Sequence, residues 1–323
     1  MEFLKLLEGI RNPVLDAFFS LVTHLGEETL FIVAGLIFFW CISKKQGYFV
    51  LFVGLFGTVV NQFLKLVFRI PRPWVQDESF TIVESARAEA TGYSFPSGHT
   101  QTAVGVFGSA AVCRKEKWLR AVSVAICVLV PFSRMYLGVH TPLDVGVSFA
   151  LALVMVFAFY PIISKCIDTP SRMRVLFSAM CVLSLAFVLF AEFYPLPSEV
   201  DNRTFEYYPY WEDADFKHYE SGIKNGYKML GCFMGLWLTY ELDRKYIKFD
   251  TSAPAVAQIL KVVLGLIPLL LIKSGLKAPL NAICGGAYFA DGIRYFIITA
   301  FAGAVWPLTF GFFSKIGKNK EKQ

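Results

Sequence analysis

One polar stretch between two apolar runs carries residue types that can transfer a phosphoryl group. It contains Arg134, His140 and Asp144, in a region where polar groups are costly. Thr141 and Pro142 predict the start of a helix, with Thr141 as the N-cap and Pro142 as the first helical residue. Asp144 then lies in the first turn, where its carboxylate can orient the His140 imidazole as a nucleophile for phosphate. A structural alternative is that Asp144 completes a capping box with Thr141 while Arg134 anchors the chain at the membrane surface.

A second polar cluster, Pro96 to His99, predicts another helix start. Ser97 is a natural N-cap, and Gly98 lets a ligand approach the backbone closely. The N–H groups and the positive dipole end of a helix start form a site for phosphate. An ordinary helix cap explains Ser97, but it does not explain His99, which enters an apolar helix.

A third cluster places Lys65 and Arg72 at the end of an apolar run. The two residues are seven positions apart, so two helical turns would bring them to one face. Each taken alone is also explained as a cation that reaches toward lipid headgroups, and the same holds for Arg69. The remaining histidines, His24 and His218, are expected to be interfacial or loop residues without chemistry.

The composition is that of a membrane protein. Of the 323 residues, 55% are hydrophobic and 17% are charged, and the mean hydropathy is +0.52. The net charge of +6 lies mostly in short loops between apolar runs, which indicates membrane topology and no nucleic-acid partner. The seven cysteines include no CxxC pair, so neither a disulfide framework nor a zinc site is indicated.

The apolar runs predict an all-α fold, a polytopic transmembrane bundle of about nine spans. The stretches interpreted as spans are roughly residues 29–42, 48–68, 97–113, 119–132, 142–163, 175–193, 223–240, 254–272 and 288–313. Residues 1–193 are predicted to form a six-span core, preceded by an interfacial amphipathic segment at 12–25. Residues 194–323 would add an aromatic, acidic loop at 194–222 and three spans of unknown role.

The distribution of basic residues predicts an orientation. The turns after the first, third, fifth, seventh and ninth spans are rich in Lys and Arg, which places them in the cytoplasm. The three polar clusters then lie together on the outer side. Their arginines break the positive-inside pattern, which favours a function that needs cations there.

The three clusters together resemble the signature of the type-2 phosphatidic acid phosphatase superfamily. The sequence contains, in order, Lys65 with six residues before Arg72-Pro73, then Pro96-Ser97-Gly98-His99, then Ser133-Arg134 with five residues before His140 and three more before Asp144. The resemblance covers roughly residues 51–165, and the typical six-span core would extend over about 20–193. The family includes membrane lipid phosphatases, undecaprenyl pyrophosphate phosphatases and glucose-6-phosphatases.

The resemblance implies a role for each signature residue. His140 would be the nucleophile, Asp144 the carboxylate that orients it, and His99 the general acid for the leaving oxygen. The phosphate would be held by Lys65, Arg72, Arg134, Ser97 and the backbone N–H of Gly98. Since phosphoryl transfer needs charge neutralisation at the phosphate oxygens, three cations and a helix N-terminus can take the place of metal ions. No metal and no other cofactor is therefore expected.

These observations predict an integral-membrane phosphatase that cleaves a lipid phosphate or lipid pyrophosphate through a phosphohistidine intermediate. A site at span ends favours phosphatidic acid, phosphatidylglycerol phosphate or an isoprenyl pyrophosphate, because the lipid tail can stay in the bilayer. We expect a plasma-membrane protein with its site facing outside and its C-terminus in the cytoplasm. A glucose-6-phosphatase-like sugar phosphatase is the alternative enzyme.

A lipid transporter or flippase that has retained the site is the alternative from another class. Asp291 and Arg294 lie three residues apart in or near an apolar run, and charges within a membrane often mark a transport pathway. We favour a local ion pair that stabilises the bundle.

Overall fold

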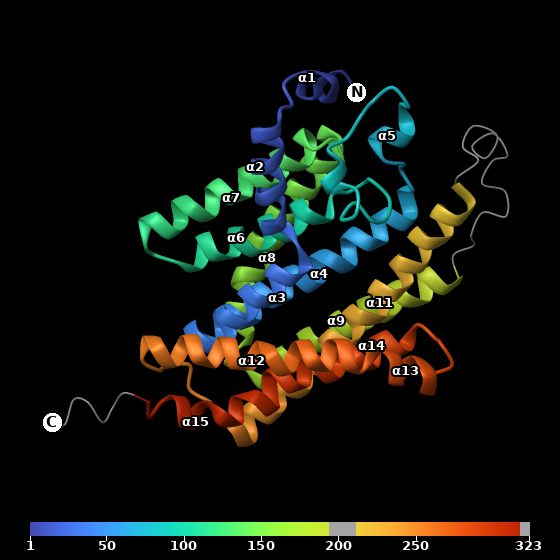
Figure 1. Cartoon of the computed structure of the whole chain (residues 1–323). Coiled ribbons are helices and arrows are strands. Elements are labelled where there is room, and N and C mark those ends of the chain that lie inside the picture. Colours follow the sequence, from blue (N-terminus) through green and yellow to red (C-terminus); the bar gives the residue numbers. More distant parts are fainter. Residues whose placement is uncertain (194–210, 317–323) are drawn as a thin grey trace. The chain divides into compact units, whose positions relative to one another are not determined.

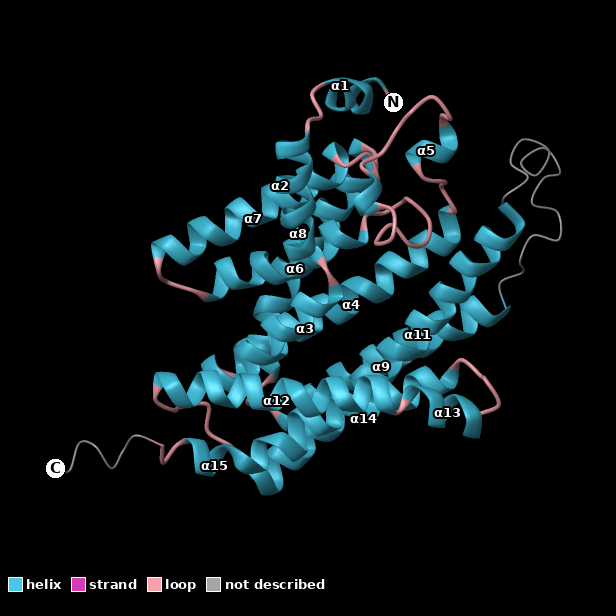
Figure 2. Cartoon of the chain, in the orientation of Figure 1, coloured by secondary structure: helices cyan, strands magenta, loops and turns pink. Residues whose placement is uncertain are grey.

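A computed structural model describes residues 1–193 and 211–316, and this part of the chain is helical with no strand (Figures 1 and 2). The predicted all-α fold class is confirmed. The longer helices are α1 (Glu2–Gly9), α2 (Pro13–Thr23), α3 (Glu28–Ile37), α4 (Lys44–Phe68), α6 (Gly98–Cys113), α7 (Lys117–Tyr136), α8 (Pro142–Cys166), α9 (Pro170–Phe193), α11 (Trp211–Leu242), α12 (Ala255–Gly275), α13 (Lys277–Ile283) and α14 (Phe289–Ala300). Shorter elements are α5 (Pro73–Gln76), α15 (Phe310–Phe313), and the 3-10 or π turns η1 (His24–Gly26), η2 (Phe38–Ile42), η3 (Glu84–Ala86), η4 (Asp243–Ile247), η5 (Phe301–Val305) and η6 (Trp306–Thr309).

Six helical segments of the described chain are long and apolar enough to cross a membrane. They are Lys44–Gln76, Lys117–Tyr136, Pro142–Cys166, Pro170–Phe193, Ala255–Ile283 and Phe289–Phe313. A seventh span is possible if Pro13–Gly26 and Glu28–Ile42, bent by 53° at their junction, count as one. The spans predicted at 97–113 and 223–240 coincide with α6 and with part of α11, so each predicted span has a helix. The interfacial position of residues 12–25 stays a prediction.

The chain divides into two compact units, and every signature residue belongs to the first. Unit 1 comprises residues 1–30, 57–156 and 186–226, and unit 2 comprises 31–56, 157–185 and 227–323. The sequence analysis divides the chain at residue 193 instead. The two compact units do not test that division into domains, so it stays a prediction. Residues 194–210 of the predicted aromatic loop lie outside the described part, and from Trp211 onward the chain is already helical.

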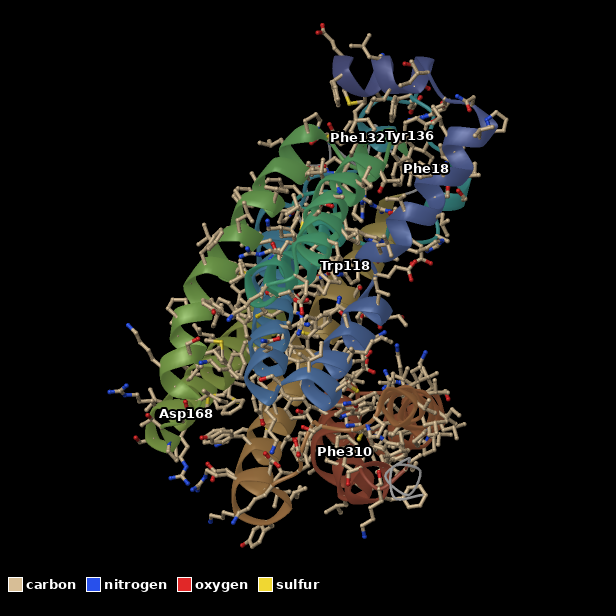
Figure 3. All side chains as sticks on the ribbon, turned by 90° about the vertical axis from the view of Figure 1, so that its left-hand side faces the viewer. Phe18, Trp118, Phe132, Tyr136, Asp168 and Phe310 are labelled. Atoms are coloured by element: carbon tan, nitrogen blue, oxygen red, sulfur yellow. The ribbon has the colours of Figure 1, made fainter. Side chains whose placement is uncertain are left out.

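Unit 1 is built on the α6–α7 hairpin, against which α2 packs (Figure 1). Phe132 and Tyr136 lie on the side of α7 that faces α2, where both rings contact Phe19, the neighbour of Phe18 (Figure 3). The same cluster takes in Ala86 and Ala90 from the long segment between α5 and α6. Because apolar side chains of this segment are buried, it is held against the helices and its backbone has a defined place beside the site.

Several polar groups of unit 2 have partners within the same unit. The indole of Trp40 donates to the carbonyl of Ala302 (2.8 Å), and the buried ammonium of Lys261 donates to the carbonyl of Trp40 (2.9 Å). Arg294 pairs with Asp291 on α14, so the ion pair favoured by the sequence is present. Each of these contacts satisfies a polar group that would be costly without a partner.

Helix α4 ends earlier than the spacing of its cations implies. The sequence analysis places Lys65 and Arg72 on one helical face, but α4 stops at Phe68 and Arg69 adopts a left-handed φ of 47°. Pro71 and Pro73 cannot continue the helical hydrogen bonding, so the chain turns and Arg72 becomes the N-cap of α5. Arg72 therefore reaches the site from a turn, and the prediction of a shared helical face was wrong.

Candidate active site

The start of α8 has the capping geometry that the sequence predicts. The Asp144 carboxylate accepts from the backbone N–H of Thr141 (2.7 Å), and the Thr141 hydroxyl accepts from the backbone N–H of Asp144 (3.2 Å). Gly138, with a φ of +82°, makes the turn between α7 and α8 that presents His140. The capping box and the chemical arrangement are therefore one structure, because the capping contacts fix the carboxylate beside the imidazole.

The surroundings of His140 select one tautomer of its ring. Nη1 of Arg72 lies 2.9 Å from Nε2 and 3.5 Å from Nδ1. The Asp144 carboxylate near Nδ1 is an acceptor, which favours a proton on Nδ1 and a lone pair on Nε2. Nδ1 lies 3.5 Å from the Asp144 carboxylate, and the ring also donates to the backbone carbonyl of Ser94. The unprotonated nitrogen thus faces a cation, which is the arrangement that a nucleophile for an anionic phosphate requires.

Ser94 is a site residue that the sequence analysis missed. Its side chain is fully buried, and its hydroxyl donates to the Asp144 carboxylate at 2.6 Å. Its carbonyl is the acceptor for the His140 ring, so one residue holds both members of the pair. Its position just before the Pro96–His99 cluster is the only signal in the sequence, and a serine in a loop is too common to be singled out.

Two of the three cations bind carbonyl groups of the segment that precedes α6. Lys65 donates to the carbonyl of Tyr93. Arg72 donates to the carbonyls of Thr91 (2.7 Å) and Gly92 (3.1 Å), and it is buried to 5% exposure. Donor groups of these two cations are therefore bound to backbone carbonyl oxygens in this structure.

Arg134 is the third cation, and it retains unused donors. Its side chain is fully buried, and Nη1 donates to the Thr23 hydroxyl at 2.7 Å. Within the described residues, Nε and Nη2 have no hydrogen-bond partner. An unpaired buried donor costs about 1–3 kcal/mol, more for a charged group, so these two N–H groups favour an anion that accepts from both.

The start of α6 brings the second histidine to the same place. Ser97 caps the helix by accepting from the backbone N–H of Thr100, and its own N–H donates to the carbonyl of Asp144 (3.1 Å). Ser97 is thus a cap and a link to α8, while the phosphate contact predicted for its hydroxyl stays a prediction. Gly98 and His99 occupy the first helical turn, where backbone N–H groups lack helical partners. The Nε2 atom of His99 is buried and, among the described groups, has no partner.

The electrostatics of the site favour the neutral form of His140. Burial lowers the pKa of His140 well below its ordinary value, and the charges of Arg72, Arg134 and Lys65 lower it further. Both effects favour the neutral imidazole over the protonated one. In the described chain no cluster of three or more His, Cys, Asp or Glu side chains is placed to hold a metal ion.

This geometry agrees with what comparison with known proteins shows. The family model described as the PAP2 superfamily matches residues 46–168, which contain the whole candidate site. Undecaprenyl-diphosphatase BcrC of Bacillus subtilis is 31% identical over 163 residues, which are 49% of this chain and 81% of that protein. The chain belongs to the PAP2 superfamily. It is an integral-membrane phosphatase, and the resemblance seen in the sequence is confirmed.

Other relatives and a second family model extend the comparison. Phosphatidylglycerophosphatase B of Bacillus subtilis is 32% identical over 163 residues, 46% of this chain and 75% of that protein. The crystal structure of LpxE from Aquifex aeolicus is 29% identical and aligns with a TM-score of 0.42 over 49% of this chain and 92% of that one. The model described as the PAP2 superfamily phosphatase transmembrane extension matches residues 227–319. That part of the chain carries no signature that the sequence analysis could assign.

Proposed function

We propose that the protein is a metal-independent lipid phosphatase that works through a phosphohistidine on His140. The observation that carries the proposal is the buried His140 ring, with the Asp144 carboxylate 3.5 Å from Nδ1 and the Arg72 guanidinium 2.9 Å from Nε2, in a site with three buried cations. The unused N–H groups of Arg134 support an anionic ligand there.

The site residues divide the reaction into two steps. In the first, Nε2 of His140 attacks phosphorus and the bond from phosphorus to the lipid oxygen breaks, while His99 gives that oxygen a proton. In the second, water attacks phosphorus, the bond from phosphorus to Nε2 breaks, and His99 takes the proton of the water. Lys65, Arg72 and Arg134 neutralise the phosphate oxygens in both steps. Lys65 and Arg72 exchange carbonyl oxygens for phosphate oxygens when the substrate binds.

The proposed substrate is a lipid with a terminal phosphate or diphosphate: phosphatidic acid, phosphatidylglycerol phosphate or an isoprenyl diphosphate. The names of the relatives, an undecaprenyl-diphosphatase and a phosphatidylglycerophosphatase, support this class. The proposed location is the plasma membrane, with the site on the outer side and the C-terminus in the cytoplasm, because the basic loops follow the positive-inside rule.

The nucleophile is tested with purified protein in detergent. His140→Ala should lower phosphate release by at least about a thousandfold and abolish an acid-labile phosphoenzyme, because it removes the attacking atom. EDTA should leave the wild-type rate unchanged. Unchanged activity of His140→Ala would contradict the mechanism, and loss of activity with EDTA would contradict metal independence.

The substrate class is tested with a panel of three compounds at equal phosphate concentration. A short-chain phosphatidic acid and an isoprenyl diphosphate should be hydrolysed with a much higher kcat/KM than glucose 6-phosphate. A preference for glucose 6-phosphate would favour the sugar-phosphatase alternative.

A further inference from the structure

Asn61 adds to the site a buried hydrogen-bond acceptor that has no donor among the described residues. It lies on α4 one helical turn before Lys65, and its side chain is buried to 2% exposure. Its Nδ2 group donates to the carbonyl of Pro96 at 3.3 Å, in the segment that leads into α6. Because that partner is an acceptor, the nitrogen must be on that side and Oδ1 must face the other way.

The Oδ1 atom of Asn61 points to the start of α6 and has no donor. It lies 3.8 Å from the position that a Cβ on Gly98 would take. Among the described residues it has no hydrogen-bond partner, and the same is true of Nε2 of the adjacent His99. The two atoms are therefore not bonded to each other. A buried acceptor without a donor is costly, and the cations of the site do not use this one.

A water molecule that donates to Asn61 Oδ1 and to His99 Nε2 would satisfy both atoms. In the second step of the proposed reaction the attacking water stands beside His99, which takes one of its protons. The second proton of the water stays on oxygen and needs an acceptor. Asn61 Oδ1 is a buried acceptor without a partner at this helix start. A lipid alcohol leaving the site has one hydroxyl proton, which it receives from His99, and it needs no second acceptor.

We propose that Asn61 is a catalytic residue that orients the attacking water by accepting a hydrogen bond from its second proton. This inference rests on the proposed phosphohistidine mechanism. The water oxygen forms a bond to phosphorus, the electron pair of the breaking bond returns to Nε2 of His140, and one water proton goes to His99. The proton held by Asn61 leaves with the phosphate product.

The test measures how the phosphoenzyme divides between water and an added alcohol. Wild-type protein is given a short-chain phosphatidic acid in the presence of glycerol, and the ratio of glycerol phosphate to inorganic phosphate is measured. Glycerol, like the leaving lipid alcohol, presents one proton to His99. Asn61→Leu, which keeps the volume of the side chain, should raise the ratio about tenfold, as expected for one hydrogen bond lost from a transition state.

Two further variants separate the acceptor from other effects. Asn61→Asp retains an acceptor oxygen but loses the donor to the Pro96 carbonyl, so its ratio should stay below that of Asn61→Leu. Gln101→Leu removes another buried amide of unit 1, one that contacts Met155 away from the site, and should not change the ratio. The ratio is independent of the amount of folded enzyme, so partial unfolding of a variant does not obscure it.

The outcomes distinguish this inference from the mechanism beneath it. No transfer to glycerol by wild-type protein, together with no phosphoenzyme, would overturn the phosphohistidine route. Transfer by wild type with an unchanged ratio in Asn61→Leu would overturn only the role of Asn61, even if kcat/KM fell, since such a fall indicates a contact with the substrate phosphate.

Discussion

At the scale of single residues, the position of the proposed nucleophile His140 depends on several neighbouring groups. The spacing of Thr141 and Asp144 predicts their contact, because residues in one helical turn are neighbours whatever the rest of the fold does. Ser94 and Asn61 could not be predicted in this way. Ser94 reaches Asp144 across 50 positions, and Asn61 reaches Pro96 across 35, so only the folded chain brings them together.

Loss of the Ser94 hydroxyl is expected to slow the reaction without preventing binding. Ser94→Ala should lower kcat about 10- to 100-fold, the range found when a group that orients a reactive histidine is removed, while KM changes little. Ser94→Thr keeps a hydroxyl and should recover part of the rate. Ser148→Ala is the matched control, because Ser148 is equally buried on α8 one turn after Asp144 and its hydroxyl has no partner among the described residues. Equal losses in Ser94→Ala and Ser148→Ala would contradict the role of Ser94.

The lowered pKa of His140 predicts the acid side of the pH profile. The proposed mechanism requires the neutral ring, and burial with three nearby cations disfavours its protonation. The acid limb of kcat/KM should therefore lie below pH 6.5, the ordinary histidine pKa of ~6.5. Arg72→Gln removes one positive charge, so it should raise the pKa and move this limb to higher pH.

The phosphate of the substrate also titrates near pH 6, so the profile is measured with a monoester and with a diphosphate. The limb that belongs to the enzyme stays at the same pH for both substrates. A limb at or above pH 6.5 in wild type that Arg72→Gln does not move would contradict the assignment.

At the scale of elements, the short turn η1 sets the position of the second histidine. A Cβ on Gly26 would lie 2.8 Å from the carbonyl oxygen of His99 and 2.9 Å from Cγ1 of Val130. The turn therefore touches the backbone of α6 at the residue that carries the proposed general acid. The hydroxyl of Thr23, at the end of α2, accepts a hydrogen bond from Arg134. The end of α2 and the turn after it therefore contact two site residues, Arg134 and His99.

Gly26→Ala should reduce activity through displacement of His99. The added methyl group must push the α6 backbone by a few tenths of an ångström or more, and misplacement on the order of 1 Å costs about a hundredfold in rate. We expect a fall in kcat of about 10- to 100-fold in a protein that still folds. Gly146→Ala is the control, because a Cβ there meets no atom within 4 Å. Full activity of Gly26→Ala would show that the contact does not position His99.

Helix starts were the elements that the sequence predicted best, and helix ends near proline the ones it predicted least well. Ser97 and Pro142 begin α6 and α8 as expected, because their caps are local. The end of α4 depends on Arg69, which takes a left-handed conformation that its residue type rarely adopts. The route of Arg72 into the site therefore had no sequence signal beyond its flanking prolines.

At the scale of the whole molecule, the fold class and the membrane character follow from composition, because apolar runs of this length are typical of helices that cross a membrane. The number of spans depends on more than composition. Helix α6 has 16 residues, so it is shorter than the six segments that are long enough to cross a membrane. Its first turn also contains the polar residue His99. The three C-terminal spans were predicted as helices, but their membership of a transmembrane extension family came from comparison alone.

The proposed orientation is tested by labelling two exposed positions in a cysteine-free background. Glu78→Cys lies in the segment before α6, and Lys115→Cys lies in the basic turn between α6 and α7. A membrane-impermeant maleimide should label the first in intact cells and the second only after the membrane is opened, because the positive-inside rule places them on opposite sides. The reverse pattern would show that the site faces the cytoplasm.

The carbonyl groups of Thr91, Gly92 and Tyr93 compete with any anionic ligand for the donor groups of Lys65 and Arg72. Phosphodiester headgroups surround the protein in a bilayer, and each carries a single negative charge. A carbonyl dipole already bound to Lys65 or Arg72 competes well against such a weakly charged group. It competes poorly against a terminal phosphate, whose charge is about −1.5 to −2. If the proposed phosphate site is correct, these contacts would select ligands by charge: they would disfavour phosphodiester lipids at the cations and give way to a lipid that ends in a phosphate.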